Sequence, residues 1–260
     1  MQPSTSTSTL PPPAAERPGP LGQAVLRLVA EAATVASLRA LSVRLRLVTL
    51  RAAAFREAVH VPGDKLQLRV AGLAFRTFTP IRLAGADDAL SVVAYLHGGA
   101  TPGAKWLAAA QPGEACHVRG PRRSLDVGAI HRSTVFFGDE TSIGLAAALC
   151  GTPLGGLDTH FVFEVDEPDD TRRALEALAD AGPARLRGAQ LVKRARGDAH
   201  LAEVEAALAR HAAADAYRQY VLSGHAGSIQ RLVRGLRRQG VRPSQMLTKA
   251  YWSPGKIGLD

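Results

Sequence analysis

Short runs in which apolar and polar residues alternate dominate the first half of the chain. Between residues 42 and 50, Val43, Leu45 and Leu47 alternate with arginines, which is the two-residue period of a half-buried strand. Similar runs, separated by turns rich in Gly, Pro and Asp, occur at residues 65–70, 73–83, 90–96 and 115–118. Short strands at this regular spacing predict a small antiparallel barrel or sandwich over about residues 33–128.

A different pattern begins near residue 131, where apolar strands alternate with longer helical stretches. The predicted strands are residues 134–137, 159–165, 189–192, 219–222 and 245–249. The predicted helices are residues 143–149, 169–180, 200–213 and 226–239. Such alternation is typical of crossover units and a parallel sheet. The sequence therefore predicts a β unit over residues 21–130 and a parallel α/β unit over residues 131–260, with the boundary near residues 126–132.

The first 33 residues divide into two segments. Residues 1–20 are rich in Ser, Thr and Pro, which predicts a disordered arm. Apolar residues then recur at helical spacing from Leu21 to Ala33, which predicts a short amphipathic helix. The arm has no basic n-region, and charged residues interrupt the apolar segment, so neither a signal peptide nor a membrane span is expected.

Composition narrows the compartment and the partners. The chain has 260 residues, of which 46% are apolar, enough for a full core without a metal or disulfide. Cys116 and Cys150 form no C-x-x-C motif, so we expect no metal site and a cytoplasmic location. The net charge of +9 favours an anionic partner, such as nucleic acid, an anionic membrane surface, a phosphate-bearing cofactor or an acidic chelate. Because the basic residues are spread along the chain, we expect no nucleic-acid partner.

One segment of the first half combines guanidinium groups, hydroxyls and an aromatic ring. The candidates in it are Arg76, Thr77, Phe78, Thr79 and Arg82. Alternation on a strand places Arg76 and Phe78 on one face, where the arginine can hold a diphosphate while the ring covers an isoalloxazine. An ordinary edge strand with its Thr and Arg side chains in solvent fits the same residues.

This segment resembles the R-x-Y-T-x-x-R flavin-binding signature of the siderophore-interacting protein family, FAD-binding ferric-siderophore reductases related to ferredoxin–NADP reductases. Further motifs similar to those of the family follow in the same order, at Pro62-Gly63-Asp64, His97-Gly98, Thr101 to Trp106, Pro112-Gly113-Glu114, Gly120-Pro121-Arg122, Gly138 to Thr141 and Tyr251-Trp252. The resemblance covers roughly residues 33–255. It implies an antiparallel β-barrel of six-stranded type that binds FAD, followed by a parallel α/β domain that binds NADPH or NADH and ends in an aromatic tail.

Three positions depart from the family pattern. Phe78 stands in place of a tyrosine whose hydroxyl would bond the flavin side chain, and Ala104 stands in place of a serine near the FAD diphosphate. Each missing hydrogen bond would weaken FAD binding by about three- to tenfold. In the second half, His225 follows Gly224 where the family usually has Gly-Glu.

Two neighbouring segments of the first half complete the expected FAD site. Gly98 and Gly99, after His97, can let backbone N–H groups approach a diphosphate, or can simply form a glycine hairpin. His-Gly-Gly also opens the oxyanion loop of esterases, but the chain has no G-x-S-x-G motif. The resemblance adds a last group of cofactor contacts at Ala104, Lys105 and Trp106.

The nucleotide-binding candidates of the second half begin at residues 138–142, which follow a strand and open a helix. Free N–H groups at such a place can meet a dinucleotide phosphate. Because acidic groups repel a phosphate, we expect Gly138, Thr141 and Ser142 to make the contacts and Asp139 to cap the helix.

A basic segment and a glycine supply the remaining nucleotide candidates. Lys193, Arg194 and Arg196 follow the third predicted strand, where they can meet the 2′-phosphate of NADPH or form a solvated basic turn. Gly224, at the end of the fourth strand, is the last nucleotide-binding candidate.

The resemblance implies a reductase in which the flavin supplies the chemistry, so we expect no catalytic side chain and no metal ligand. Electrons would pass from NADPH or NADH through FAD to Fe(III) in a ferric siderophore, releasing Fe(II). Lys105 and Lys249 are expected at the rim of a basic cleft for this anionic chelate. Trp252 would cover the flavin or the nicotinamide, or would pack the tail onto the barrel. The alternative is a non-catalytic relative that binds flavin or siderophore. We expect a monomer or a weak dimer.

Overall fold

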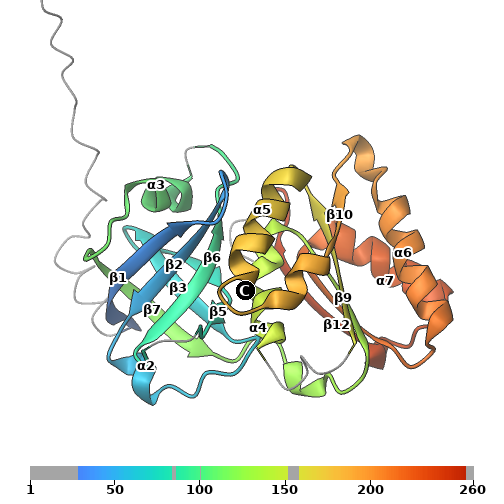
Figure 1. Ribbon diagram of the computed structural model, residues 1–260, viewed down its shortest axis with the longest axis horizontal. Coiled ribbons are helices and arrows are strands. Elements are labelled where there is room, and N and C mark those ends of the chain that lie inside the picture. The colour runs from blue at the N-terminus through green and yellow to red at the C-terminus, as the bar shows by residue number, and fades with distance from the viewer. Residues whose placement is uncertain (1–28, 84–85, 100, 152–157, 256–260) are drawn as a thin grey trace, which may run out of the picture.

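The computed structural model describes residues 29–83, 86–99, 101–151 and 158–255, and it contains two sheets that lie side by side (Figure 1). The first is antiparallel, with strands β1 (Glu31–Ala40), β2 (Leu45–Arg51), β3 (Lys65–Ala71), β4 (Ala74–Phe78), β5 (Pro80–Ile81), β6 (Ala89–Tyr95) and β7 (Ala115–Arg122). Its order is β4-β3-β7-β1-β2-β6-β5. The outer strands β4 and β5 are joined through Thr79 alone, so the two edges of the sheet meet there and the sheet curls into a barrel.

The second sheet is parallel, as predicted. It contains β8 (Thr134–Gly138), β9 (Thr159–Val165), β10 (Gln190–Lys193), β11 (Gln219–His225) and β12 (Met246–Trp252), in the order β10-β9-β8-β11-β12. Helices α4 (Ile143–Cys150), α5 (Pro168–Ala179), α6 (Leu201–Ala214) and α7 (Ala226–Arg238) cover its two faces. The predicted fold class, an antiparallel β unit followed by a parallel α/β unit, is confirmed. The boundary predicted near residues 126–132 lies between β7 and β8, and the division into 21–130 and 131–260 stays a prediction.

Short helices connect the strands. In the barrel these are α2 (Ala54–Glu57) and α3 (Pro102–Ala109). The Thr101 side chain caps α3 by accepting a hydrogen bond from the Ala104 N–H at 3.3 Å. The 3-10 helices span Val127–Ala129, Glu140–Ser142, Ala184–Gly188, Arg196–Asp198 and Pro243–Gln245.

Two sequence-based expectations are wrong at the ends of the chain. The predicted helix from Leu21 to Ala33 does not continue beyond residue 30, because β1 begins at Glu31 and buries Ala33 and Val35 in alternation with exposed residues. Residues 1–28, which include the predicted arm, lie outside the described residues. The aromatic tail was expected after the last strand, but Trp252 is the last residue of β12 and is paired with His225 of β11.

Helix α4 forms the main contact between the two sheets. Its Ile143 and Leu145 belong to one apolar cluster with Leu45, Ile81 and Val93 of the barrel. Gly144 allows the close approach, since a Cβ there would lie 3.3 Å from the carbonyl oxygen of Thr79. The segment predicted to hold flavin is therefore fixed against the second sheet.

A buried carboxylate fastens a second point of this contact. Asp170, in the first turn of α5, accepts hydrogen bonds from the Ser42 hydroxyl (2.8 Å) and from the backbone N–H groups of Val43 (2.9 Å) and Arg44 (3.1 Å). Burial alone would raise the pKa of Asp170, but these bonds and that from Arg173 outweigh it and lower the pKa. The turn between β1 and β2 is thus tied to α5.

Replacing Asp170 should loosen this connection. Asp170→Asn keeps one acceptor oxygen but loses the charge, and we expect it to lower the free energy of unfolding by about 2 kcal/mol. The control is Asp169→Asn, because Asp169 is exposed in the same helical turn and should change stability by less than about 0.5 kcal/mol. Urea unfolding at about pH 7 measures both, and equal values for the two variants would contradict the assignment.

The same variant has a predicted pH dependence. Because the pKa of Asp170 is lowered in the folded protein, its stabilisation is complete above the unfolded value of about 3.9 and is lost as the pH falls through the lower folded value. The stability difference between wild type and Asp170→Asn should therefore persist at about pH 5 and shrink below about pH 3.9.

Candidate functional site

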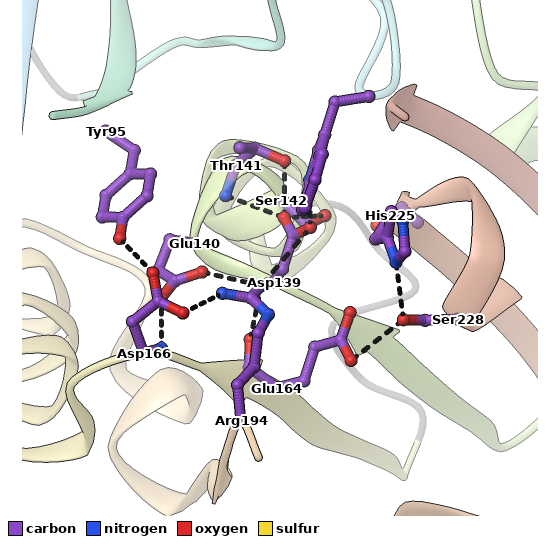
Figure 2. A network of polar contacts seen from close by, with 12 residues as sticks. Tyr95, Asp139, Glu140, Thr141, Ser142, Glu164, Asp166, Arg194, His225 and Ser228 are labelled. Atoms are coloured by element: carbon purple, nitrogen blue, oxygen red, sulfur yellow. Dashed lines mark hydrogen bonds and ion pairs between the residues drawn. The ribbon is translucent and has the colours of Figure 1, made fainter. Parts of the chain in front are cut away.

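Charged side chains gather where the strands of the parallel sheet end (Figure 2). Asp139 and Glu140 follow β8, Asp166 follows β9 and Arg194 follows β10. In a sheet of this order, ligands bind outside the carboxyl ends of the strands, at the point where the strand order reverses. Here that point lies between β8 and β11.

Arg194 is the cation at the centre of this cluster. Its guanidinium lies 2.8 Å from Asp166 Oδ1, 3.0 Å from Glu140 Oε2 and 3.8 Å from Asp139 Oδ2, and it donates to the carbonyl of Glu164 at 3.2 Å. Burial alone would lower the pKa of Arg194, but the surrounding carboxylates raise it. Burial raises the pKa of Glu140 despite the nearby Arg194. Lys193 and Arg196 are exposed, whereas Arg194 is half-buried among these carboxylates.

Asp139 connects the loop after β8 to the last strand. It is fully buried, and it accepts hydrogen bonds from the Thr141 N–H at 2.9 Å and from the Trp252 indole N–H at 2.7 Å. The capping role predicted for Asp139 is confirmed. The indole also stacks on His225, with ring centroids 4.4 Å apart. Trp252 is therefore fixed beside the carboxyl ends of β8 and β11.

The predicted phosphate-binding residues at these strand ends have partners within the chain. The Ser142 hydroxyl is buried and lies 3.4 Å from Asp139 Oδ1, and the Thr141 hydroxyl also donates to that oxygen. A Cβ on Gly138 would lie 2.5 Å from Ser142 Cβ, and one on Gly224 would lie 2.4 Å from Asp139 Oδ2. Packing within the chain thus explains both glycines without a ligand.

Glu164 is a buried carboxylate that the sequence analysis missed. Its Oε2 lies 2.8 Å from His200 Nε2 and accepts a hydrogen bond from the Ser228 hydroxyl at 3.0 Å, and Ser228 in turn contacts His225 Nδ1 at 3.1 Å. Its Oε1 has no hydrogen-bond partner among the described residues. An acidic residue inside the otherwise apolar run His160-Phe161-Val162-Phe163-Glu164-Val165 is the signal that could have identified it.

The barrel residues predicted to hold FAD lie along β4 and the start of α3. Arg76 and Phe78 pair with Leu68 and Leu66 of β3, which places them on one face as predicted. A Cβ on Gly103 would lie 3.5 Å from Arg76 Cγ, so the arginine lies against the first turn of α3. This donor set of a guanidinium, a helix N-terminus and an aromatic ring suits a dinucleotide such as FAD.

Among the neighbouring candidates, some have open space around them and others pack against the barrel core. Gly98 and Gly99 have φ values of +75° and +80° and open space where a Cβ would lie, so backbone can be approached there. Trp106 packs against the barrel core, as does Phe78. His97 and Lys105 are exposed, and Ala104 is half-buried.

Three candidates of the segment have structural contacts. Thr77 lies on the opposite face from Arg76 and accepts from Gln67 at 3.3 Å. Arg82 donates to the carbonyls of Asp87 and Phe55 at 2.7 and 3.2 Å, which fixes the loop before β6. The Thr79 hydroxyl lies 2.9 Å from the Tyr251 hydroxyl and links the barrel to β12.

The protein thus combines a barrel with a parallel sheet, and the charged cluster around Arg194 lies at the carboxyl edge of that sheet. The model of the siderophore-interacting FAD-binding domain matches residues 67–125, the segment from β3 to the end of the barrel. The resemblance to the siderophore-interacting family is thereby confirmed. No curated protein matches the chain.

Solved structures with the same fold include reductases and FAD/NAD-binding domains. The siderophore-interacting protein from Acinetobacter baumannii matches with a TM-score of 0.68 and 16% identity, over 88% of this chain and 92% of that one. The flavohem-like FAD/NAD-binding domain of the nitric oxide dioxygenase from Vibrio cholerae O1 biovar El Tor matches with a TM-score of 0.63 and 14% identity, over 87% and 100%. Full-length CYP116B46 from Tepidiphilus thermophilus matches with a TM-score of 0.67 and 16% identity, over 86% of this chain and 29% of that much longer one.

None of the helices in the described ranges has the length and apolar character needed to cross a membrane. Within the same ranges, His, Cys, Asp and Glu side chains form no group of three or more that could hold a metal ion.

The packing of Gly224 against Asp139 gives a testable consequence. Gly224→Ala places a Cβ against the carboxylate that holds Trp252, so we expect a loss of about 2 kcal/mol beyond the cost of the positive φ alone. Gly240→Ala is the control, because Gly240 also has a positive φ but open space around its Cβ position. Urea unfolding and tryptophan emission measure the effect. Equal losses for both variants, with unchanged emission, would contradict the packing argument.

Proposed function

We propose that the chain is an FAD-dependent reductase that transfers electrons from NADH or NADPH through FAD to Fe(III) in a ferric siderophore, releasing Fe(II). The observation behind the proposal is the coincidence of the FAD-binding domain match at residues 67–125 with the juxtaposition of Arg76, Phe78 and the start of α3. The fold, which is shared with FAD/NAD-binding domains, supports a nicotinamide donor.

FAD is assigned to the barrel side of the contact between the two sheets. Arg76, the backbone at Gly98 and Gly99 and the first turn of α3 would hold the diphosphate, and Phe78 would cover the ring system. Bound FAD would accept two electrons from the nicotinamide and pass them on one at a time. Thr79 and Tyr251 fix the position of the second sheet relative to this segment, since their hydroxyls meet across the contact.

The iron chelate is assigned to a basic rim. Lys105 is exposed on α3 of the barrel half, and Lys249 is half-buried on β12 of the second sheet. Positive charge at these positions would attract an anionic ferric siderophore, and Trp252 on the same strand as Lys249 would form part of the wall. We further propose that the protein acts in the cytoplasm as a monomer or weak dimer, without nucleic acid.

A non-catalytic relative that binds flavin or siderophore is the second candidate. The contacts of Trp252 favour it, because the indole is bonded to Asp139 and stacked on His225 at the crevice where a nicotinamide would enter. On this alternative the protein holds flavin that no nicotinamide nucleotide reduces.

The absorption spectrum of the purified protein tests the proposal. We expect an oxidised-flavin spectrum with added FAD, bleaching by a nicotinamide nucleotide without oxygen, and recovery when a ferric siderophore is added. Bound flavin that neither NADH nor NADPH bleaches would instead support the non-catalytic relative. If the protein binds no FAD at all, neither the reductase nor a flavin-binding relative describes it.

Phe78 gives a prediction specific to the flavin site. Phe78→Tyr restores a hydroxyl on the face shared with Arg76, and we expect FAD to bind about three- to tenfold more tightly. Phe75→Tyr is the control, because Phe75 lies on the opposite face of β4, under the guanidinium of Arg119. Fluorescence titration of FAD measures both variants. An unchanged affinity for Phe78→Tyr would place the flavin ring elsewhere.

A further inference from the structure

The carboxyl edge of the parallel sheet bears on which nicotinamide nucleotide the protein uses. In sheets whose order reverses beside the first strand, an acidic residue after the second strand takes the 2′-hydroxyl of the NAD ribose, whereas an arginine nearby accommodates the 2′-phosphate of NADP. Here β8 is the first strand and β9 the second, and Asp166 directly follows β9. Arg194 follows the third strand, β10, and contacts Asp166.

The arginine that would accept a 2′-phosphate is already neutralised. Its guanidinium contacts the carboxylates of Asp166 at 2.8 Å and Glu140 at 3.0 Å, with Asp139 at 3.8 Å, and it also donates to a backbone carbonyl. A phosphate would have to displace these carboxylates and leave at least one buried charge without its partner, which is costly. Arg194 is therefore a structural cation rather than a phosphate ligand.

Asp166 has the properties of a ribose acceptor. Its side chain is 44% exposed, with Oδ1 bonded to Arg194 and Oδ2 accepting from the Tyr95 hydroxyl at 3.0 Å. Each carboxylate oxygen can accept a second hydrogen bond, so the group can still receive a ribose hydroxyl. Burial alone would raise the pKa of Asp166, but Arg194 and Tyr95 lower it, so the carboxylate is charged at neutral pH and repels a phosphate.

We propose that the donor is NADH in preference to NADPH, and that Asp166 is the residue that determines this choice. The inference rests on the proposed function and adds the identity of its electron donor. Lys193 and Arg196 are the opposing charges, since both are exposed, Lys193 at the end of β10 and Arg196 at the start of the 3-10 helix that follows. In solvent such cations attract a phosphate weakly, whereas the carboxylate of Asp166 is held in place by two partners.

The test compares both nucleotides on wild type and two matched variants. Asp166→Asn removes the charge after β9, and Asp158→Asn removes an arginine-paired carboxylate before the same strand, where Asp158 lies 3.5 Å from Arg218. Calorimetric titration with NAD⁺, NADP⁺ and 2′,5′-ADP measures binding without turnover, and anaerobic bleaching of the FAD-loaded protein gives kcat/KM for NADH and NADPH.

For wild type we expect NAD⁺ to bind more tightly than NADP⁺ and NADH to be the better donor. Asp166→Asn should lower the NADH to NADPH ratio of kcat/KM by about tenfold and should tighten 2′,5′-ADP binding, because it removes a repulsive charge. Asp158→Asn should leave the ratio unchanged. Urea unfolding of both variants verifies that they fold.

Three results would overturn the inference, and they separate it from the proposed function. A wild type that prefers NADPH overturns the inference alone, leaves the reductase proposal standing and assigns the phosphate to Lys193 and Arg196. An NADH preference that Asp166→Asn does not alter removes Asp166 as its cause. If neither nucleotide binds to the FAD-loaded wild type or bleaches it, both the inference and the proposal of a nicotinamide donor are overturned. The wild-type measurement alone decides this.

Discussion

The half-buried guanidinium of Arg194, paired with carboxylates, is the interaction on which the arrangement of the carboxyl edge depends. Asp139, Glu140 and Asp166 come from two different strand ends, and without a cation between them their charges would repel one another at short range. Buried charges are tolerated where they are paired, and removing one partner leaves the others uncompensated. Arg194 therefore allows three acidic side chains to lie together at the carboxyl edge of the sheet, the edge at which α/β sheets bind their ligands.

The position of the barrel relative to the second sheet depends on the same cluster. Asp166 bonds both Arg194 and Tyr95 of β6, so the charge network continues into the barrel. Asp170 fastens the turn after β1 to α5, and Thr79 meets Tyr251 beside the point where the barrel edges join. Around these polar contacts, α4 packs its apolar residues against β5 and β6. The two sheets are consequently held together by charged, polar and apolar contacts.

The sequence predicted the strands and helices of the second half well, because their apolar runs are long and strongly patterned. It missed β1, in which alanines supply much of the apolar alternation and only Ala33 and Val35 are deeply buried. Alanine is also the best helix former, so the helical pattern predicted over residues 21–33 continues into this strand. Motif order pointed to the segment that the FAD-binding domain model matches, whereas no motif marks Glu164 and Asp166, whose side-chain partners lie 28 or more residues away along the chain. Periodicity predicts which face of a strand or helix a residue lies on, but it does not identify the charged partner that the residue contacts in the folded protein.

The two halves of the candidate site consequently differ in how they can bind a nucleotide. On the barrel, Gly98 and Gly99 leave their backbone open and Arg76 lies beside a helix N-terminus, which is the chemistry of a diphosphate site. On the sheet, side chains of the chain itself occupy the space beside Gly138 and Gly224, and the Ser142 hydroxyl is bonded to Asp139. Arg194 is paired with carboxylates. A nucleotide that approaches this second surface meets acceptors for hydroxyl groups and the stacked rings of His225 and Trp252. Groups that could bind phosphate charge therefore lie on the barrel, whereas the sheet offers hydrogen-bond acceptors and stacked rings.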